Sequence, residues 1–391
     1  MKVTINLNLL FVLILIILNS INSEFKSLKV QKSLKSSLKS SNSNNSSDCK
    51  CTEDKLILIF NAYSYKAKEG PENKNGFKTL EIPKENKKYM EKYFHDVLPE
   101  CVEFEQAALK EAFWLIYKPK KDVYVLSIVV NKKRVIIFKG TDGMEAFVKL
   151  LSNFEVKKSK DFTGDIIKYA LNKNRIIKHV LDDFLAKVPE NKLILSGHSQ
   201  GGANSYAYAA YLFNKGNESK LLKKFDDISI VNFAGMFAGD DKLDMSFCKK
   251  IHGRNYITSS ILNEKNDKQL DFIYFLNKGD VNMILFGRKQ IIADPYNVNK
   301  CKANFKQLYF SVTPASKGVS AESFEVASKL ERKICKVNNK FIKNVKRSGN
   351  ICKAAKGNKW FFRAFSGLWL HPILKYAEGI SKFNDVSECL V

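Results

Sequence analysis

The sequence predicts an α/β protein in which helices cover both faces of a mostly parallel central sheet. Short apolar runs, typical of buried strands, alternate with longer segments whose apolar residues recur at helical spacing. With 45% apolar residues, the 391-residue chain can form a sizeable core. The third observation is segment 192–213, KLILSGHSQGGANSYAYAAYLF, which fits a strand, a tight turn and a helix of small residues. We expect the fold to be organised around this segment.

The N-terminal 55 residues differ in composition from the rest of the chain. Residues 1–23 hold one lysine and an apolar run from Leu9 to Leu18, so we expect a secretory signal peptide cleaved near Ser23 rather than a retained anchor. Residues 24–55 are rich in Ser, Lys and Asn, which predicts a disordered linker. The catalytic domain is then expected at 56–391, and the protein is expected to be secreted or to lie within the secretory pathway.

The remaining elements are predicted from periodicity. Residues 55–60 fit either a first strand or the start of a helix, and 68–88 is polar and rich in turn formers. The sequence predicts helices at 89–117, with a break at Pro99, and at 166–188. It predicts strands at 123–130, 135–138, 228–233, 255–257 and 272–276. Residues 319–346 show a lysine-rich helical pattern, which we interpret as part of a basic insertion at about 319–359.

Cysteines and charge limit the classes of function. Eight cysteines in an exported chain predict up to four disulfides, whose pairing the sequence does not give. Without Cys-x-x-Cys pairs or clustered histidines, no metal or other cofactor is expected. The net charge of +25 favours contact with anionic lipid head groups or acidic polymers, and no aromatic-basic module points to nucleic acid.

The turn within 192–213 has the pattern of a nucleophile elbow. In Gly197-His198-Ser199-Gln200-Gly201, the serine lies where a strand turns sharply into a helix. The two flanking glycines leave room for the backbones that approach each other there. The amide of Gln200 opens the helix and can point at a developing oxyanion. The pattern predicts Ser199 as the nucleophile, although an ordinary glycine-rich turn has the same composition.

Four segments together resemble the class 3 (fungal-type) lipases of the α/β-hydrolase superfamily. They are the strand end 135–141 (VIIFKGT), the elbow 197–202 (GHSQGG), the turn 271–280 (DFIYFLNKGD) and the late segment 370–376 (LHPILKY). The sequence departs from the family at Lys139, where arginine is usual, and at Gln200, where leucine is usual. The resemblance implies the α/β-hydrolase fold and a Ser-acid-His triad in chain order.

The resemblance implies roles for particular residues. The histidine of the triad should follow the acid, which favours His371 over His252, while His95, His179 and His198 are expected to have structural or surface positions. The acid is assigned to Asp280, just after a predicted strand, with Asp294, Asp240 and Asp241 as alternatives. Thr141 is expected to complete the oxyanion hole with Gln200.

A helical pattern between Thr141 and Ile166 is either a mobile lid or a plain core helix. Its apolar residues are Met144, Phe147, Val148, Leu151 and Phe154, and the resembled family carries its lid at this point, here 142–160. The sequence therefore predicts a secreted serine esterase that acts on lipid esters, a triacylglycerol lipase or a phospholipase, at a membrane or lipid-droplet interface. The alternatives are an acyltransferase on the same fold and a non-catalytic basic protein that binds membranes or glycans.

Overall fold

The structure is a computed structural model. It describes residues 51–140, 156–214, 220–240, 242–243, 246–248, 250–261, 268–270, 304–311 and 373–381. The expected signal peptide, the expected insertion at 319–359 and the strand expected at 272–276 lie outside these residues.

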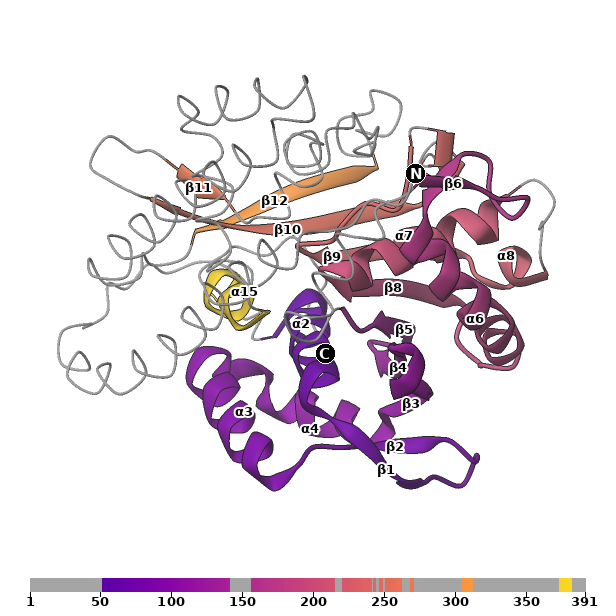
Figure 1. The fold of residues 1–391 in the computed structure, drawn as a ribbon. Helices are drawn as coiled ribbons and strands as arrows, with labels where there is room; N and C mark the ends of the chain where they lie inside the picture. Colours follow the sequence, from indigo (N-terminus) through magenta and orange to yellow (C-terminus); the bar gives the residue numbers. More distant parts are fainter. Residues whose placement is uncertain are drawn as a thin grey trace, which may run out of the picture.

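A single large sheet forms the centre of the described part of the chain (Figure 1). It has ten strands in the order β1-β2-β3-β4-β5-β8-β9-β10-β11, with β12 also paired to β10. The strands are β1 (Lys68–Glu72), β2 (Lys78–Glu81), β3 (Phe113–Lys118), β4 (Val123–Val130), β5 (Lys133–Phe138), β8 (Lys192–His198), β9 (Asp227–Phe233), β10 (His252–Ile261), β11 (Lys268–Leu270) and β12 (Phe305–Ser311). A separate two-stranded sheet pairs β6 (Val156–Lys158) with β7 (Asp165–Ile167).

The middle of the large sheet is parallel and its outer strands are antiparallel. Strands β5, β8, β9, β10 and β12 run in the same direction, whereas β1 to β4 and β11 pair antiparallel with their neighbours. The parallel strands β5 and β8 contain continuous apolar runs, at 135–138 and 193–195, because both of their faces are covered. In β8, every residue after Lys192 is buried. This arrangement confirms the α/β sheet predicted from the sequence.

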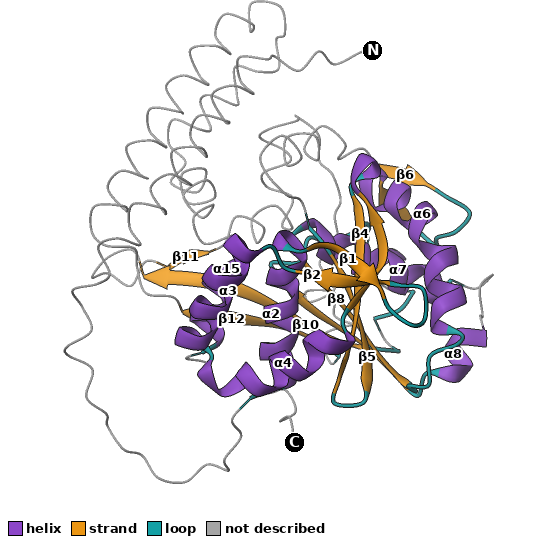
Figure 2. Ribbon diagram, turned by 90° about the horizontal axis from the view of Figure 1, so that it is seen from below, coloured by secondary structure: helices purple, strands orange, loops and turns teal. Residues whose placement is uncertain are grey.

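Helices pack on both faces of the sheet. They are α2 (Glu53–Lys66), α3 (Lys84–Val97), α4 (Val102–Glu111), α6 (Lys168–Leu185), α7 (Gln200–Phe213), α8 (Lys220–Lys224) and α15 (Ile373–Ile380), with short 3₁₀ turns η2 (Pro99–Cys101) and η3 (Pro119–Lys121). Within β8, the Ser196 hydroxyl accepts a hydrogen bond from Asn61 of α2 at 2.9 Å, while a side chain at Gly197 would collide with α7. Because neighbouring strand residues point to opposite faces, α2 and α7 cover opposite sides. Figure 2 shows α3 and α4 on the side of α2, away from α6 and α8.

Helix α2 is the central helix of its face. The run Leu56 to Tyr63 is buried all round, which is why its periodicity alone did not distinguish a strand from a helix. Two buried acids in its first turn hold the sheet: Glu53 pairs with Lys133 at 3.0 Å and Asp54 with Arg254 at 2.7 Å. Carboxylates at a helix N-terminus are also favoured by the helix dipole.

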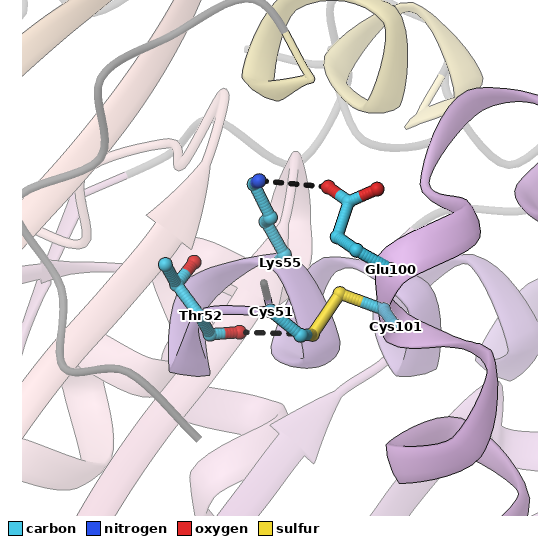
Figure 3. Close-up of a disulfide and its surroundings, with 5 residues drawn as sticks. All are labelled: Cys51, Thr52, Lys55, Glu100 and Cys101. Carbon is cyan, nitrogen blue, oxygen red and sulfur yellow. Dashed lines mark hydrogen bonds and ion pairs between the residues drawn. A yellow bond between two sulfur atoms is a disulfide. The ribbon is translucent and has the colours of Figure 1, made fainter. Parts of the chain in front are cut away.

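The expected linker is too long at its C-terminal end, because residues 51–55 belong to the folded domain. Cys51 is fully buried and forms a disulfide with Cys101 in η2 (Figure 3). One turn further along, Lys55 pairs with Glu100 at 2.8 Å. A disulfide and the ion pairs of three charged side chains fix this stretch, which its polar composition did not reveal.

One predicted helix is wrong in its last part. Residues 84–111 are helical with a break at Pro99, but Phe113–Lys118 is strand β3. The four consecutive residues from Phe113 to Ile116 are all buried, with side chains on both faces of the sheet. Such a run fits a helical pattern equally well. The polar stretch 68–88 also contains β1 and β2. No helix in the described ranges is both long and apolar enough to cross a bilayer.

Candidate active site

Ser199 lies in a strained turn between β8 and α7. Its backbone angles are φ 57° and ψ −122°, a conformation that costs a non-glycine residue on the order of 1–3 kcal/mol. Hydrogen bonds on both sides of the turn hold it: the Ser199 amide donates to Phe233 O at 3.1 Å. The Ser199 carbonyl accepts from Gly202 N and Met236 N, each at 3.0 Å. The chain therefore holds this serine at the carboxyl end of the central parallel strand.

Glycines permit the close approaches around the turn. A Cβ at Gly197 would collide with the backbone of Gly201, and one at Gly201 would collide with the carbonyl of Phe138. A Cβ at Gly202 would meet Gly235, in the loop after β9. The three glycines bring β5, β8, α7 and the β9 loop together around Ser199. The sequence pattern predicts the need for a glycine at two of these positions, Gly197 and Gly201.

The structure describes Gln200, one of the two predicted oxyanion donors. It also describes the end of β5, which leads to the other predicted donor, Thr141. Gln200 is the first residue of α7, where backbone amides have no helical partner. Strand β5 pairs with β8 through Phe138 and Gly197, so Gly140, the last described residue before Thr141, lies at the elbow. Thr141 itself lies outside the described residues, as do residues 142–155 of the expected lid, while 156–158 form β6.

The histidines in the described part of the chain do not lie where a base for Ser199 would have to lie. His252 begins β10 and pairs with Ser229, which is level with Ile194. It therefore lies about 15 Å below the serine along the strands and two strands away. His179 is exposed on α6, and His95 lies 4.0 Å from the carboxylate of Glu105.

His198 is buried beside the elbow, but its ring points to the face of α2. Its Nδ1 shares a hydrogen bond with Tyr65 Oη of α2 at 2.8 Å. The ring also packs edge-on against Tyr376 of α15, with centroids 5.7 Å apart. Sequence reasoning did not identify Tyr65, because nothing in its local pattern marks it. The predicted residues His371, Asp280, Asp294 and Asp241 lie outside the described residues.

Asp240, one of the alternative acids, is described. Its carboxylate accepts the Leu243 N–H at 3.0 Å, and its own N–H donates to Asp165 O at 3.0 Å. These bonds give it a role in the turn that joins the β9 loop to β7. Among the described residues, no three His, Cys, Asp or Glu side chains gather as a metal site would require.

Comparison with known proteins gives a family for the segment that holds these features. The family model for lipase (class 3) matches residues 135–262, about a third of the 391 residues, from β5 through the elbow to the end of β10. This segment is similar to class 3 lipases. A comparison of the sequence with curated proteins finds no match.

Solved structures of fungal lipases are also similar to the chain. The mono- and diacylglycerol lipase from Aspergillus oryzae is 14% identical, with 55% of this chain and 72% of that chain covered and a TM-score of 0.38. Lipase II from Rhizopus niveus is 15% identical, with 53% and 73% covered and a TM-score of 0.33. A triacylglycerol lipase from Penicillium expansum is 16% identical, with 51% and 68% covered and a TM-score of 0.32.

The family match and the geometry of the elbow confirm the resemblance drawn from the sequence. A sheet with parallel central strands, helices on both faces and a serine in a strand-to-helix elbow are the features of the α/β-hydrolase fold. The match to class 3 lipases also confirms the class of enzyme, a serine hydrolase of carboxylic esters.

Proposed function

We propose that the protein is a secreted lipase or phospholipase that hydrolyses acyl ester bonds of lipids. The observation that carries the proposal is the strained elbow at Ser199, inside the segment that matches the class 3 lipase model. Such a turn holds the serine at the end of the strand and directs the amides of the following helix at the carbonyl under attack.

In the proposed mechanism, Ser199 attacks the ester carbonyl while His371 takes up its proton. Asp280 holds the imidazole in the correct tautomer and stabilises the imidazolium. The amides of Gln200 and Thr141 bind the oxyanion. The protonated histidine gives its proton to the leaving alcohol, and the acyl-enzyme is then hydrolysed by water, which restores the serine.

The assignment of His371 is supported by elimination and by the position of α15. The sequence has five histidines, and the four that are described have the other positions given above. Helix α15 begins at Ile373, two residues after His371, and its Tyr376 packs against His198, the neighbour of Ser199. The chain therefore returns to the elbow directly after His371.

Export is supported by the covalent structure. The disulfide between Cys51 and Cys101, and the disulfide that Cys248 also forms, are typical of proteins that fold in an oxidising compartment. N-terminal sequencing of the protein from the culture medium tests this part of the proposal, and a mature N-terminus near residue 24 is the expected result.

A fluorophosphonate probe tests the nucleophile. We expect the probe to label the protein, and Ser199→Ala to abolish labelling and to lower hydrolysis by on the order of 10⁴-fold or more. Ser205→Ala is the matched control, because Ser205 is a buried serine of α7 that bonds to Asn232 at 3.0 Å. Labelling that persists in Ser199→Ala would contradict the proposal.

Paired histidine variants and a substrate panel test the rest. His371→Ala should lose hydrolysis, whereas His252→Ala should retain it. Triacylglycerol, diacylglycerol and phospholipid substrates, assayed with and without an added alcohol acceptor, separate a lipase from a phospholipase and from an acyltransferase. The absence of cleavage of every lipid ester would overturn the substrate class, even if Ser199 is labelled.

A further inference from the structure

His198 lies next to the nucleophile, yet its ring takes no part in the mechanism proposed above. It is 4% exposed, at the last position of β8, and it lies between an aromatic ring of α2 and one of α15. A buried imidazole with a hydrogen-bond partner and two edge-on aromatic neighbours has a fixed orientation.

Tyr65 connects this ring to the oxyanion side of the site. Its hydroxyl bonds to His198 Nδ1 at 2.8 Å, and it lies so close to Gly140 that a Cβ on that glycine would collide with it. The same Cβ would collide with the His198 carbonyl. Lys139, next to Gly140, extends its ammonium over the ring of Tyr124, 4.4 Å from the centroid. The strand end that leads to Thr141 is therefore packed directly on the Tyr65–His198 pair.

Tyr376 connects the same ring to the histidine side. Besides His198, it packs edge-on against Phe233, whose carbonyl accepts the Ser199 amide. Its hydroxyl accepts the Thr258 N–H from β10 at 3.5 Å. Tyr376 is fully buried, so α15 has little freedom to move relative to the ends of β8, β9 and β10.

We propose that Tyr65 and His198 are positioning residues that set the distance between the oxyanion donors and the catalytic histidine. The inference rests on the proposed function, because it takes Thr141 as a donor and His371 as the base. The imidazole of His198 contacts Tyr65 and Tyr376. It lies between the strand end before Thr141 and the helix that follows His371, and it fixes the separation of these two elements. Loss of the Tyr65 hydroxyl lets the strand end shift, which weakens transition-state binding but leaves substrate binding unchanged.

The test is Tyr65→Phe, with kcat, KM and the rate of fluorophosphonate labelling measured on folded protein. Because a misplacement of about 1 Å far from the chemistry can cost on the order of 100-fold, we expect kcat and the labelling rate to fall about tenfold to a hundredfold. KM should change less than about twofold, since only transition-state interactions are lost. The matched control is Tyr63→Phe, which also removes a buried α2 hydroxyl but one that bonds to Glu105, away from the elbow.

Two histidine variants complete the test. Asparagine can place an oxygen near the position of Nδ1, so His198→Asn should keep most of the labelling rate that His198→Leu loses. The double variant Tyr65→Phe/His198→Leu should be no slower than His198→Leu alone, because both remove the same hydrogen bond.

Equal labelling rates for Tyr65→Phe and Tyr63→Phe would overturn the inference. So would additive losses in the double variant. These results differ from a failure of the proposed function, in which Ser199→Ala would still be labelled or hydrolysis would be absent in every variant, wild type included.

Discussion

The side chain of Gln200 is buried without a hydrogen-bond partner among the described residues. It is 1% exposed, and neither its amide nitrogen nor its amide oxygen is bonded. Leaving a buried polar group unpaired costs about 1–3 kcal/mol, because the group has lost its water. The helical position needs only the backbone amide of this residue for the oxyanion. The side chain is therefore a cost that an apolar residue would avoid.

We predict that Gln200→Leu raises the free energy of unfolding by about 1–3 kcal/mol. Urea unfolding followed by fluorescence measures the change. Asn61→Leu is the control with the opposite sign, since Asn61 donates to Ile57 O at 3.0 Å and to Ser196 Oγ at 2.9 Å. A Gln200→Leu variant less stable than wild type would contradict the prediction.

For single residues, the sequence predicts those roles that depend on residues close by in the chain. Gly197, Ser199 and Gly201 lie within five positions, so the steric demands of one turn are visible in the chain itself. Tyr65 is not visible, because its contact with His198 spans 133 positions and its own helix gives it no distinguishing pattern. Positioning residues on distant elements are found only once the fold brings them together.

Helix α4 carries a buried carboxyl whose titration links its packing to pH. Glu105 is 2% exposed and accepts a hydrogen bond from Tyr63 of α2. Burial raises the pKa of Glu105 above its ordinary value, and the charge of Glu91 adds to this. The hydrogen bond from Tyr63 and the charge of His95 act in the opposite direction. The folded state thus favours the protonated form of Glu105 relative to the unfolded chain.

We predict that Glu105→Gln becomes more stable, relative to wild type, as the pH rises. A group whose pKa is raised on folding contributes its full stabilisation below its unfolded pKa, and the contribution is lost as the pH rises through the folded pKa. The wild type should therefore lose stability upward from about pH 4.5, the ordinary value. Urea midpoints of both proteins between about pH 4 and pH 8 measure the difference. Glu103→Gln, an exposed change in the same helix, is the control, and a difference independent of pH would count against the prediction.

Elements were predicted well where the apolar pattern has one reading, either helical spacing along one face or a short apolar run between turn residues. Helix α6 follows its apolar spacing, and the interior strands β4, β5, β8 and β9 follow their apolar runs. The prediction failed at β3 because four successive buried residues carry no periodicity that separates a strand from a helix. Whether a run is covered on both sides depends on the elements that pack on the faces of the sheet, which for β3 include α6, whose Phe184 contacts Phe113.

The disulfide between Cys51 and Cys101 closes a loop that holds α2, β1, β2 and α3. The two cysteines are 50 positions apart, and closing a loop of that length stabilises a fold by about 4 kcal/mol in the chain-entropy estimate. The sequence indicated disulfides from the even number of cysteines, but pairing is a property of the whole molecule and could not be predicted.

We predict that Cys51→Ala/Cys101→Ala lowers the free energy of unfolding by about 2–5 kcal/mol. Alanine is used because both positions are fully buried, where a serine hydroxyl would add its own cost. Urea unfolding without a reductant measures the loss, and the wild type under mild reduction is the comparison. An unchanged urea midpoint would show that the first turn of α2 is held without this bond.

The net charge of the whole chain leads to a prediction about the lipid surface. A charge of +25 attracts anionic membranes, at about 1 kcal/mol for each lysine or arginine that comes close to the head groups. We expect the protein to sediment with phosphatidylserine vesicles and only weakly with phosphatidylcholine vesicles. Binding should fall steeply as salt rises toward about 1 M, where charges are screened within about 3 Å.

Ser199→Ala separates this binding from catalysis, because it keeps every surface charge and should sediment as the wild type does. The same diacylglycerol, placed in the two kinds of vesicle, should be hydrolysed faster by the wild type on the anionic surface, and the advantage should disappear in high salt. Equal sedimentation with both vesicles in low salt would show that the lysines serve solubility. The lipid interface would then be recognised by apolar contacts alone, which salt does not weaken.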